Sequence, residues 1–201
     1  MNLTNRAYQK LLKKDVPPWL ERNNPLMLVW CSLRKWINVS VIPFIPFNSI
    51  RIVLYRMVGF RIGRNVFIGM QCYLDDMHPD RMAIEDDVVI SYRVTIACHG
   101  PRSDNHRLIL KKGCYIGCNA TLIGGRPQGD VVIGEYASVG ACALVYKSVP
   151  PLTKVAGIPA YVIRQNQMPW AGDDHRLKEI MQRLGIPEDN YADSAPNFPH
   201  R

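Results

Sequence analysis

The sequence lacks an apolar run long enough to cross a membrane, because a spanning helix needs about 20 such residues. The longest uncharged stretch, residues 36–50, is shorter and is interrupted by Pro43 and Pro46. Residues 1–14 are polar and lack the apolar centre of a secretory signal peptide. The sequence therefore predicts a protein without a membrane span and without a signal peptide.

Cysteine pairs with metal-ligand spacing are also missing. The chain has six cysteines, none in a C-x-x-C pair, and Cys114 and Cys118 have no second pair to complete a zinc site. In the absence of a signal peptide, we interpret the cysteines as reduced thiols and expect a cytoplasmic protein.

Acidic residues are scarce. The chain has 17 Asp and Glu against 25 Lys and Arg, which gives a formal net charge of +8. This charge favours an anionic partner, which could be a nucleic acid, a lipid surface or a phosphorylated ligand. The remaining composition is globular, with 47% apolar and 21% charged residues, and it excludes disorder as the main state. A length of 201 residues suits one domain with appendages.

The dominant pattern from Ile62 onward is an aliphatic residue at every sixth position. A small or β-branched residue commonly follows four places later. This period is typical of a parallel β-helix, in which three six-residue units form one triangular coil. Each aliphatic side chain points into the prism, where its burial contributes about 1.5–3 kcal/mol. The aliphatic positions are Ile62, Ile68, Leu74, Ile84, Ile90, Ile96, Leu110, Ile116, Leu122, Ile133, Val139, Val145 and Val155.

The repeat is interrupted after every third unit. Because each interruption follows three regular units, every insertion is predicted to leave the prism at the same edge. The longest insertion, residues 98–109, is the candidate wall of a groove. At the four interruptions, the distance between successive aliphatic positions exceeds the regular six residues. It is ten residues from Leu74 to Ile84, fourteen from Ile96 to Leu110, eleven from Leu122 to Ile133 and ten from Val145 to Val155.

The segments on either side of the repeats are predicted to cap the prism, since open solenoid ends expose unpaired strand edges. Thr4–Lys14 predicts a short basic helix, and a second helix is expected from Asp173 or Asp174 through Leu184. Residues 25–60 are apolar and aromatic with interspersed basic residues. They are interpreted either as helices covering the first coil or as an interfacial segment on anionic lipid. The expected organisation is a cap over residues 1–60, a β-helix over 61–164, and a C-terminal helix and tail over 165–201.

Four segments between Ile50 and Arg164 resemble the hexapeptide-repeat acyltransferases: RMVGFRIGRNVFIG, VTIACH, GCYIGCNATLIGG and VYKSVPPLTKVAGIPAYVIR. The last is similar to the family's ending T-K-D-x-P-P…V-A-G-x-P-A-x-x-I-R. The chain looks most like the branch of maltose, galactoside and Nod-factor O-acetyltransferases and the enzymes that acetylate capsular polysaccharides. The resemblance implies a left-handed β-helix, acetyl-CoA as acyl donor, no metal, and a homotrimer with sites between neighbouring prisms.

The resemblance implies that His99 is the general base, because His99 ends VTIACH at the mouth of the longest insertion, where the family places that residue. A neutral imidazole can take a hydroxyl proton near working pH. Cys98 beside it would allow a covalent route, but neighbours in an extended strand point to opposite sides, and the family transfers the acyl group directly. We therefore do not assign Cys98 as a nucleophile.

The resemblance also implies residues that bind the two substrates. Lys147 and Arg164 are expected at the nucleotide end of the coenzyme, where cations suit phosphate. Asp75 and Asp76 occupy the place where sugar-acetylating relatives keep an acidic residue, and a carboxylate accepts hydrogen bonds from sugar hydroxyls. Further coenzyme contacts are expected from Tyr115, Cys118, Ala141 and Tyr146.

The predicted function is acetyl-CoA-dependent O-acetylation of a sugar hydroxyl in a surface glycan or its precursor. N-acetylation of an amino sugar is the alternative within the same reaction class. A γ-carbonic-anhydrase-like enzyme is another, but it needs three zinc-binding histidines with a close H-x4-H pair, and six residues separate His99 from His106. A nucleic-acid partner is not expected, since no motif interleaves basic and aromatic residues.

Overall fold

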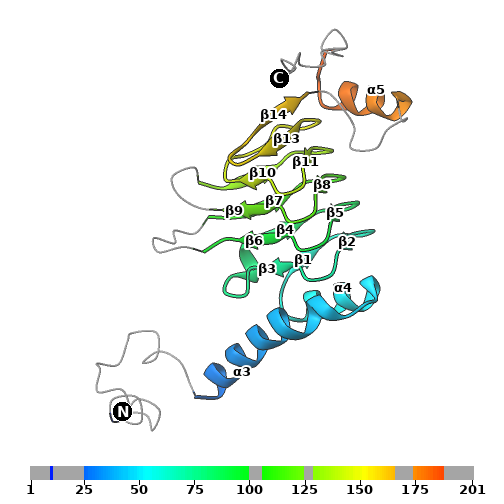
Figure 1. Ribbon diagram of the computed structural model, residues 1–201. Coiled ribbons are helices and arrows are strands. Elements are labelled where there is room, and N and C mark those ends of the chain that lie inside the picture. The colour runs from blue at the N-terminus through cyan, green and yellow to red at the C-terminus, as the bar shows by residue number, and fades with distance from the viewer. Residues whose placement is uncertain (1–9, 11–24, 100–105, 125–128, 166–173, 188–201) are drawn as a thin grey trace.

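The computed structural model describes residue 10 and residues 25–99, 106–124, 129–165 and 174–187. Strands β1 to β12 wind into a parallel β-helix (Figure 1), which confirms the predicted all-β core. The strands are β1 (Arg61–Ile62), β2 (Phe67–Ile68), β3 (Tyr73–Leu74), β4 (Met82–Ile84), β5 (Val89–Ile90), β6 (Thr95–Ala97), β7 (Leu108–Leu110), β8 (Tyr115–Ile116), β9 (Thr121–Ile123), β10 (Val131–Ile133), β11 (Ser138–Val139), β12 (Leu144–Val145), β13 (Lys154–Gly157) and β14 (Ala160–Arg164).

The prism has three faces, each a stack of one strand per coil. The first face has the order β1-β4-β7-β10, the second β2-β5-β8-β11-β13-β14, and the third β3-β6-β9-β12. All neighbours pair in parallel except β13 and β14, which form an antiparallel hairpin at the far end. The helices lie outside this prism: α3 (Pro25–Trp36), the π-helix η1 (Ile37–Val41), the 3-10 helices η2 (Ile42–Phe44) and η3 (Pro79–Arg81), α4 (Asn48–Met57) and α5 (Asp174–Arg183).

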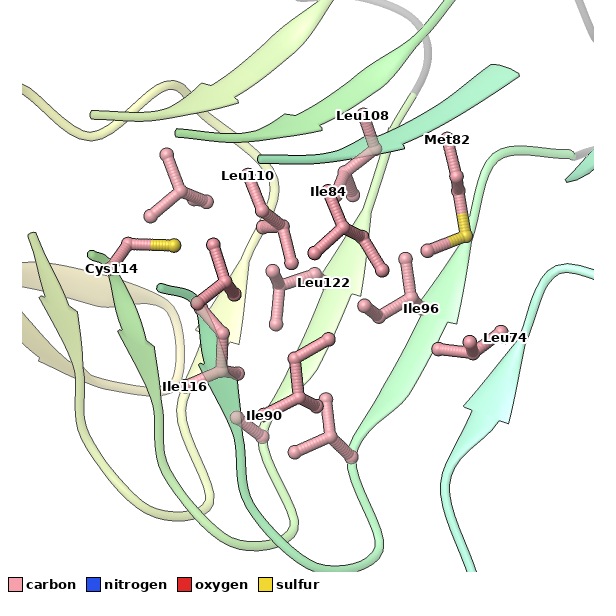
Figure 2. Close-up of a cluster of buried hydrophobic side chains, with 14 of the residues drawn as sticks. Leu74, Met82, Ile84, Ile90, Ile96, Leu108, Leu110, Cys114, Ile116 and Leu122 are labelled. Atoms are coloured by element: carbon pink, nitrogen blue, oxygen red, sulfur yellow. The ribbon is translucent and has the colours of Figure 1, made fainter. Parts of the chain in front are cut away.

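The aliphatic positions of the repeat stack in columns, as the six-residue period predicts. On the second face, Ile90 pairs in register with Ile68 and Ile116, and all three side chains are fully buried. Figure 2 shows the same arrangement across the three faces, with the side chains meeting inside the prism. The columns of the three faces meet inside the prism and form one continuous hydrophobic core.

Two of the three prism edges turn tightly and regularly. Gly117 lies where adjacent coils approach each other, and a Cβ there would be 2.6 Å from the backbone nitrogen of Ala141. The turning residues adopt left-handed conformations, which let the chain change direction within one or two residues. These residues are Asn65, Asp87, Gly113, Tyr136 and Leu152 at one edge, and Gln71, Arg93, Asn119 and Cys142 at the other.

The third edge, where the chain passes from the third face to the first, carries all four insertions. They connect β3 to β4, β6 to β7, β9 to β10, and β12 to the following coil. This arrangement confirms the prediction that the insertions share one edge, which we call the insertion edge. Residues 100–105 and 125–128 of these insertions lie outside the described residues.

The helices before β1 close the exposed strand edge of the first coil (Figure 1). Asn38 donates from Nδ2 to the Leu74 carbonyl at 2.9 Å, and Arg51, 2% exposed, donates from Nε to the Ile68 carbonyl at 3.1 Å. These side chains pair strand-edge groups that no further coil could satisfy. The helices thus act as a cap, as one of the two interpretations of residues 25–60 expects. The helix predicted over Thr4–Lys14 lies, except for Lys10, outside the described residues.

At the opposite end, α5 begins at Asp174 and is followed by Gly185, whose φ of 67° suits a helix C-terminus. Its Ile180 and Met181 are buried against Tyr136 and Leu152 of the last coils. Among the helices of the described residues, none has the length and apolarity needed to traverse a bilayer.

Candidate active site

His99 and Asp75 form a hydrogen-bonded pair at the insertion edge. His99 follows β6, Asp75 follows the neighbouring strand β3, and the distance from His99 Nδ1 to Asp75 Oδ2 is 2.8 Å. The His99 side chain is 32% exposed, whereas the Asp75 side chain is fully buried. The insertion edge therefore presents the imidazole to solvent and holds the carboxylate behind it.

Asp75 is held by backbone groups as well as by His99. Its Oδ1 accepts the N–H groups of Met77 and His78 at 2.9 and 3.0 Å, and its Oδ2 accepts the N–H of Cys98. Burial disfavours the charged carboxylate, but the hydrogen bonds from His99 and from these backbone groups outweigh it and keep the pKa of Asp75 below its usual range. The environment of Asp75 at the insertion edge therefore favours its ionised form.

The pair fixes the tautomer of His99. An ionised carboxylate can only accept hydrogen bonds, so Nδ1 carries the proton that it donates to Asp75. Nε2 then has a free lone pair and can accept a proton from a substrate. The arrangement is that of a general base oriented by a buried carboxylate.

This geometry differs from the expectation that Asp75 contacts a sugar. A side chain with no exposed surface and four hydrogen-bond donors around it has no capacity left for a substrate hydroxyl. The structure makes Asp75 a partner of His99 instead. The repeat places Asp75 near the end of β6, because β3 and β6 pair in parallel, but nothing in the pattern indicates that its carboxylate turns toward His99 and the backbone.

Asp76, by contrast, remains partly accessible beside the pair. Its side chain is 19% exposed, and its Oδ1 accepts a hydrogen bond from the Tyr73 hydroxyl. Lys35 Nζ of α3 lies 3.9 Å from its Oδ2. Burial and the adjacent Asp76 carboxylate raise the pKa of Tyr73, which keeps the phenol protonated as a donor. Tyr73 and Lys35 were not identified as site residues from the sequence. For Tyr73 the sequence offers one indication, its alternation with the buried Leu74; for Lys35 it offers none.

Ligand atoms of Asp75, Asp76 and His99 lie within 4.8 Å of one another, a spacing that a metal site would also need. In this group, however, the Asp75 oxygens accept hydrogen bonds from three backbone N–H groups and from His99 Nδ1. These hydrogen bonds explain why the three side chains lie close together: Asp75 is the carboxylate that orients the base His99.

Cys98 points into the core rather than toward the insertion edge. It is 2% exposed, and burial, reinforced by the nearby Asp75 charge, raises the pKa of its thiol to about 12. A thiol in this environment is not ionised at neutral pH and cannot serve as the nucleophile. The alternation of β6 thus places Cys98 and His99 on opposite sides, as expected.

Tyr146 and Lys147 lie on the same edge as His99, two strands further along the third face. Strands lie about 4.8 Å apart, and β9 separates β6 from β12. Lys147 Nζ is 5.7 Å from the centre of the Tyr146 ring, and both residues line a recess against the β13–β14 hairpin. Arg164 ends that hairpin opposite Lys154. Lys154 pairs with Ser138 at the start of the second face, so Arg164 lies near the edge between the first and second faces and not beside Lys147 on the insertion edge.

The remaining expected coenzyme residues lie elsewhere. Cys118 and Ala141 follow β8 and β11 at the edge between the second and third faces, and Tyr115 is on the second face. The Cys118 Sγ lies 2.8 Å from Ser91 Oγ, and that hydrogen bond lowers the pKa of the thiol. One chain thus does not bring these three residues together with His99.

No protein-family profile matches the chain. It is 27% identical over 135 residues to the Bacillus subtilis protein YvoF, which is named as an acetyltransferase; the match covers 65% of this chain and 76% of that protein. It is 34% identical over 83 residues to a serine acetyltransferase of Buchnera aphidicola, a match covering 41% of this chain and 30% of that protein.

Among solved structures, a hexapeptide-repeat-containing acetyltransferase of Vibrio cholerae superposes with a TM-score of 0.55 at 22% identity, covering 78% of this chain and 98% of that one. This likeness establishes the β-helix fold. The chain spans about a third of the serine acetyltransferases and about three quarters of YvoF. The sequence relatives support an acyltransferase, and the chain shares its β-helix fold with a hexapeptide-repeat-containing acetyltransferase.

Proposed function

We propose that the protein is an O-acetyltransferase in which His99 activates an acceptor hydroxyl for direct attack on acetyl-CoA. The observation that carries this proposal is the His99–Asp75 pair, which leaves Nε2 of a partly exposed imidazole free to accept a proton. His99 takes the hydroxyl proton as the oxygen attacks the thioester carbonyl. The resulting imidazolium, stabilised by ionised Asp75, returns the proton to the departing coenzyme thiolate.

We propose a sugar as the acceptor, with Asp76 as the carboxylate that accepts hydrogen bonds from its hydroxyls. Asp76 is partly exposed and lies beside the catalytic pair, with Tyr73 as a neighbouring donor. An amino-acid hydroxyl is the second candidate, because several relatives are named serine acetyltransferases. Both acceptors offer a hydroxyl, so the role of His99 is the same in either case.

The acceptor class can be tested with the purified protein, acetyl-CoA and three matched sets of compounds: sugars and glycan precursors, amino sugars, and L-serine. Mass spectrometry should detect one acetyl group added to a sugar, and alkaline treatment should remove it as an ester. Acetylserine as the main product would replace the sugar by an amino acid. An alkali-resistant acetyl group on an amino sugar would indicate N-acetylation.

The division of the expected site between two prism edges supports a homotrimer. His99 and Lys147 lie on the insertion edge, whereas Cys118 and Ala141 lie on another. A groove between neighbouring prisms would bring one edge of each copy together and complete the coenzyme site. Light scattering at micromolar concentration should therefore give three times the mass of one chain, and a monomeric mass would contradict this arrangement.

Lys147→Ala and Arg164→Ala are expected to raise the KM for acetyl-CoA while changing kcat little. Both cations lie in the last coil and its hairpin, several strands away from His99, so they would hold phosphates in ground state and transition state alike. Steady-state kinetics with saturating acceptor provides the measurement, and Lys178→Ala, an exposed cation of α5, is the matched control. A collapse of kcat with unchanged KM would remove both residues from the coenzyme's nucleotide end.

A further inference from the structure

The cap presents an exposed apolar surface on the side that does not contact the prism. In α4, one side buries Arg51, Ile52 and Tyr55, and the other exposes residues at helical spacing i, i+3 and i+7. The connection before α4 exposes two phenylalanines, and α3 exposes two tryptophans. The surface, which we call the cap surface, consists of Val29, Trp30, Leu33, Trp36, Phe44, Phe47, Ile50, Val53 and Met57, with exposed fractions from 44% to 73%.

The spacing in each helix places its exposed apolar side chains on one side of that helix. Ile50, Val53 and Met57 follow the i, i+3, i+7 pattern, and Val29, Leu33 and Trp36 follow i, i+4, i+7. Figure 1 places α3 and α4 at the end of the prism opposite α5. Contiguous exposed apolar side chains of this kind mark a contact with another surface.

The charged side chains on the segment that carries the cap surface are all basic. From residue 25 to residue 74 the sequence has no Asp or Glu, and it has six basic residues: Arg34, Lys35, Arg51, Arg56, Arg61 and Arg64. Arg51 is buried against carbonyls, and Arg56 donates to the carbonyls of Ile62 and Gly63 while keeping its charge. Apolar and aromatic side chains with cations and without acidic groups are the chemistry that an anionic lipid surface selects.

We propose that the cap surface docks onto an anionic membrane surface, with the apolar side chains entering the interface and the basic residues facing lipid headgroups. Trp30 and Trp36 suit this position, because indole rings favour the boundary between headgroups and acyl chains. The Lys35 side chain at the end of α3 is 40% exposed, and its long stem lets its charged end reach the same boundary.

Docking in this way would bring the acceptor end of the site close to the lipid. Lys35 of α3 lies 3.9 Å from Asp76, and Asn38 of η1 binds the carbonyl of Leu74, which immediately precedes Asp75. This consequence rests on the proposed function: if a sugar is the acceptor, a lipid-anchored precursor is the form that the docked protein meets. The docking itself does not depend on catalysis.

The test is co-sedimentation of the full-length protein with vesicles of phosphatidylcholine alone and of phosphatidylcholine mixed with phosphatidylglycerol. We expect at least about tenfold stronger partitioning onto the anionic vesicles, and a loss of that preference as salt is raised. The double variant Phe47→Ser/Val53→Ser should reduce anionic binding about tenfold or more, since it removes two exposed apolar groups.

Tyr161→Ser/Val162→Ser is the matched control, because these residues have similar exposure, 59% and 47%, at the opposite end of the prism. It should bind vesicles like the wild type. Thermal unfolding verifies that both variants are folded. Acetyl transfer to a soluble acceptor is measured with Phe47→Ser/Val53→Ser, because Tyr161 and Val162 line the same recess as Lys147, and it separates a failure of docking from a failure of the proposed function.

Equal binding to neutral and anionic vesicles, or equal loss in both double variants, would overturn the proposal. So would unchanged vesicle binding in Phe47→Ser/Val53→Ser combined with a smaller oligomer in light scattering. That result would assign the cap surface to contacts between copies of this chain.

Discussion

Replacing His99 by alanine is expected to lower kcat by about 10²–10⁴-fold, the range that a general base contributes. The protein should stay folded and should still bind acetyl-CoA. His99 is partly exposed, and Asp75 keeps its three backbone donors when the imidazole is removed. Steady-state kinetics, together with acetyl-CoA binding by calorimetry, separates the catalytic loss from a loss of affinity.

His99→Asn should be as impaired as His99→Ala, because an amide is polar but does not accept a proton at neutral pH. His106→Ala is the matched control, since His106 belongs to the same insertion, has 25% side-chain exposure and lies 3.9 Å from the Asp130 carboxylate. A His99→Ala enzyme that keeps more than about a tenth of kcat would exclude His99 as the base.

Asp75→Asn is expected to lower kcat by up to about 10⁴-fold, the loss that follows when an orienting carboxylate is replaced by an amide. The asparagine oxygen can still accept from Met77 and His78, but its NH₂ then faces the N–H of Cys98 and Nδ1 of His99. His99 would shift its proton to Nε2 to relieve this contact, and Nε2 could no longer accept one. The KM for acetyl-CoA should change little, which identifies Asp75 as a positioning residue.

The same substitution should also change how stability depends on pH. The folded pKa of Asp75 lies below its usual value, so the ionised carboxylate stabilises the fold above its unfolded pKa of about 3.9. That contribution is lost as pH falls through the lower folded value. The free energy of unfolding of wild type should therefore exceed that of Asp75→Asn at neutral pH, with the difference shrinking in acid.

Asp76→Asn is the control for charge, because it removes a carboxylate from the next position in the chain. It should raise the KM for the acceptor. If Asp75→Asn kept wild-type kcat, the orienting role of Asp75 would be wrong.

The fold could be predicted in detail because its repeat records the core directly. An aliphatic residue every six positions leaves one geometry in which Ile68, Ile90 and Ile116 can stack in register. The breaks after every third unit likewise determine which edge carries the insertions. The caps were less predictable, since Asn38 and Arg51 contribute by pairing with particular strand carbonyls and neither has a periodic signal.

Only those features of the site that depend on residues within one short motif could be predicted from the sequence. VTIACH places His99 at the end of a strand, and alternation places Cys98 in the core. The partner of His99 is 24 residues away and follows the adjacent strand β3, and the motif itself does not indicate which side chain of that neighbouring coil turns toward the imidazole. The location of Cys118 and Ala141 on another edge follows from the winding of the coils, which no single motif encodes.

The most direct test of the central claim is acetyl transfer from isotopically labelled acetyl-CoA, followed by mass spectrometry of both protein and acceptor. Direct transfer predicts that the label appears on an acceptor hydroxyl with wild type and His106→Ala, is nearly absent with His99→Ala, and never appears on the protein when acceptor is omitted. Labelled protein in the absence of acceptor, or equal product with His99→Ala, would contradict it.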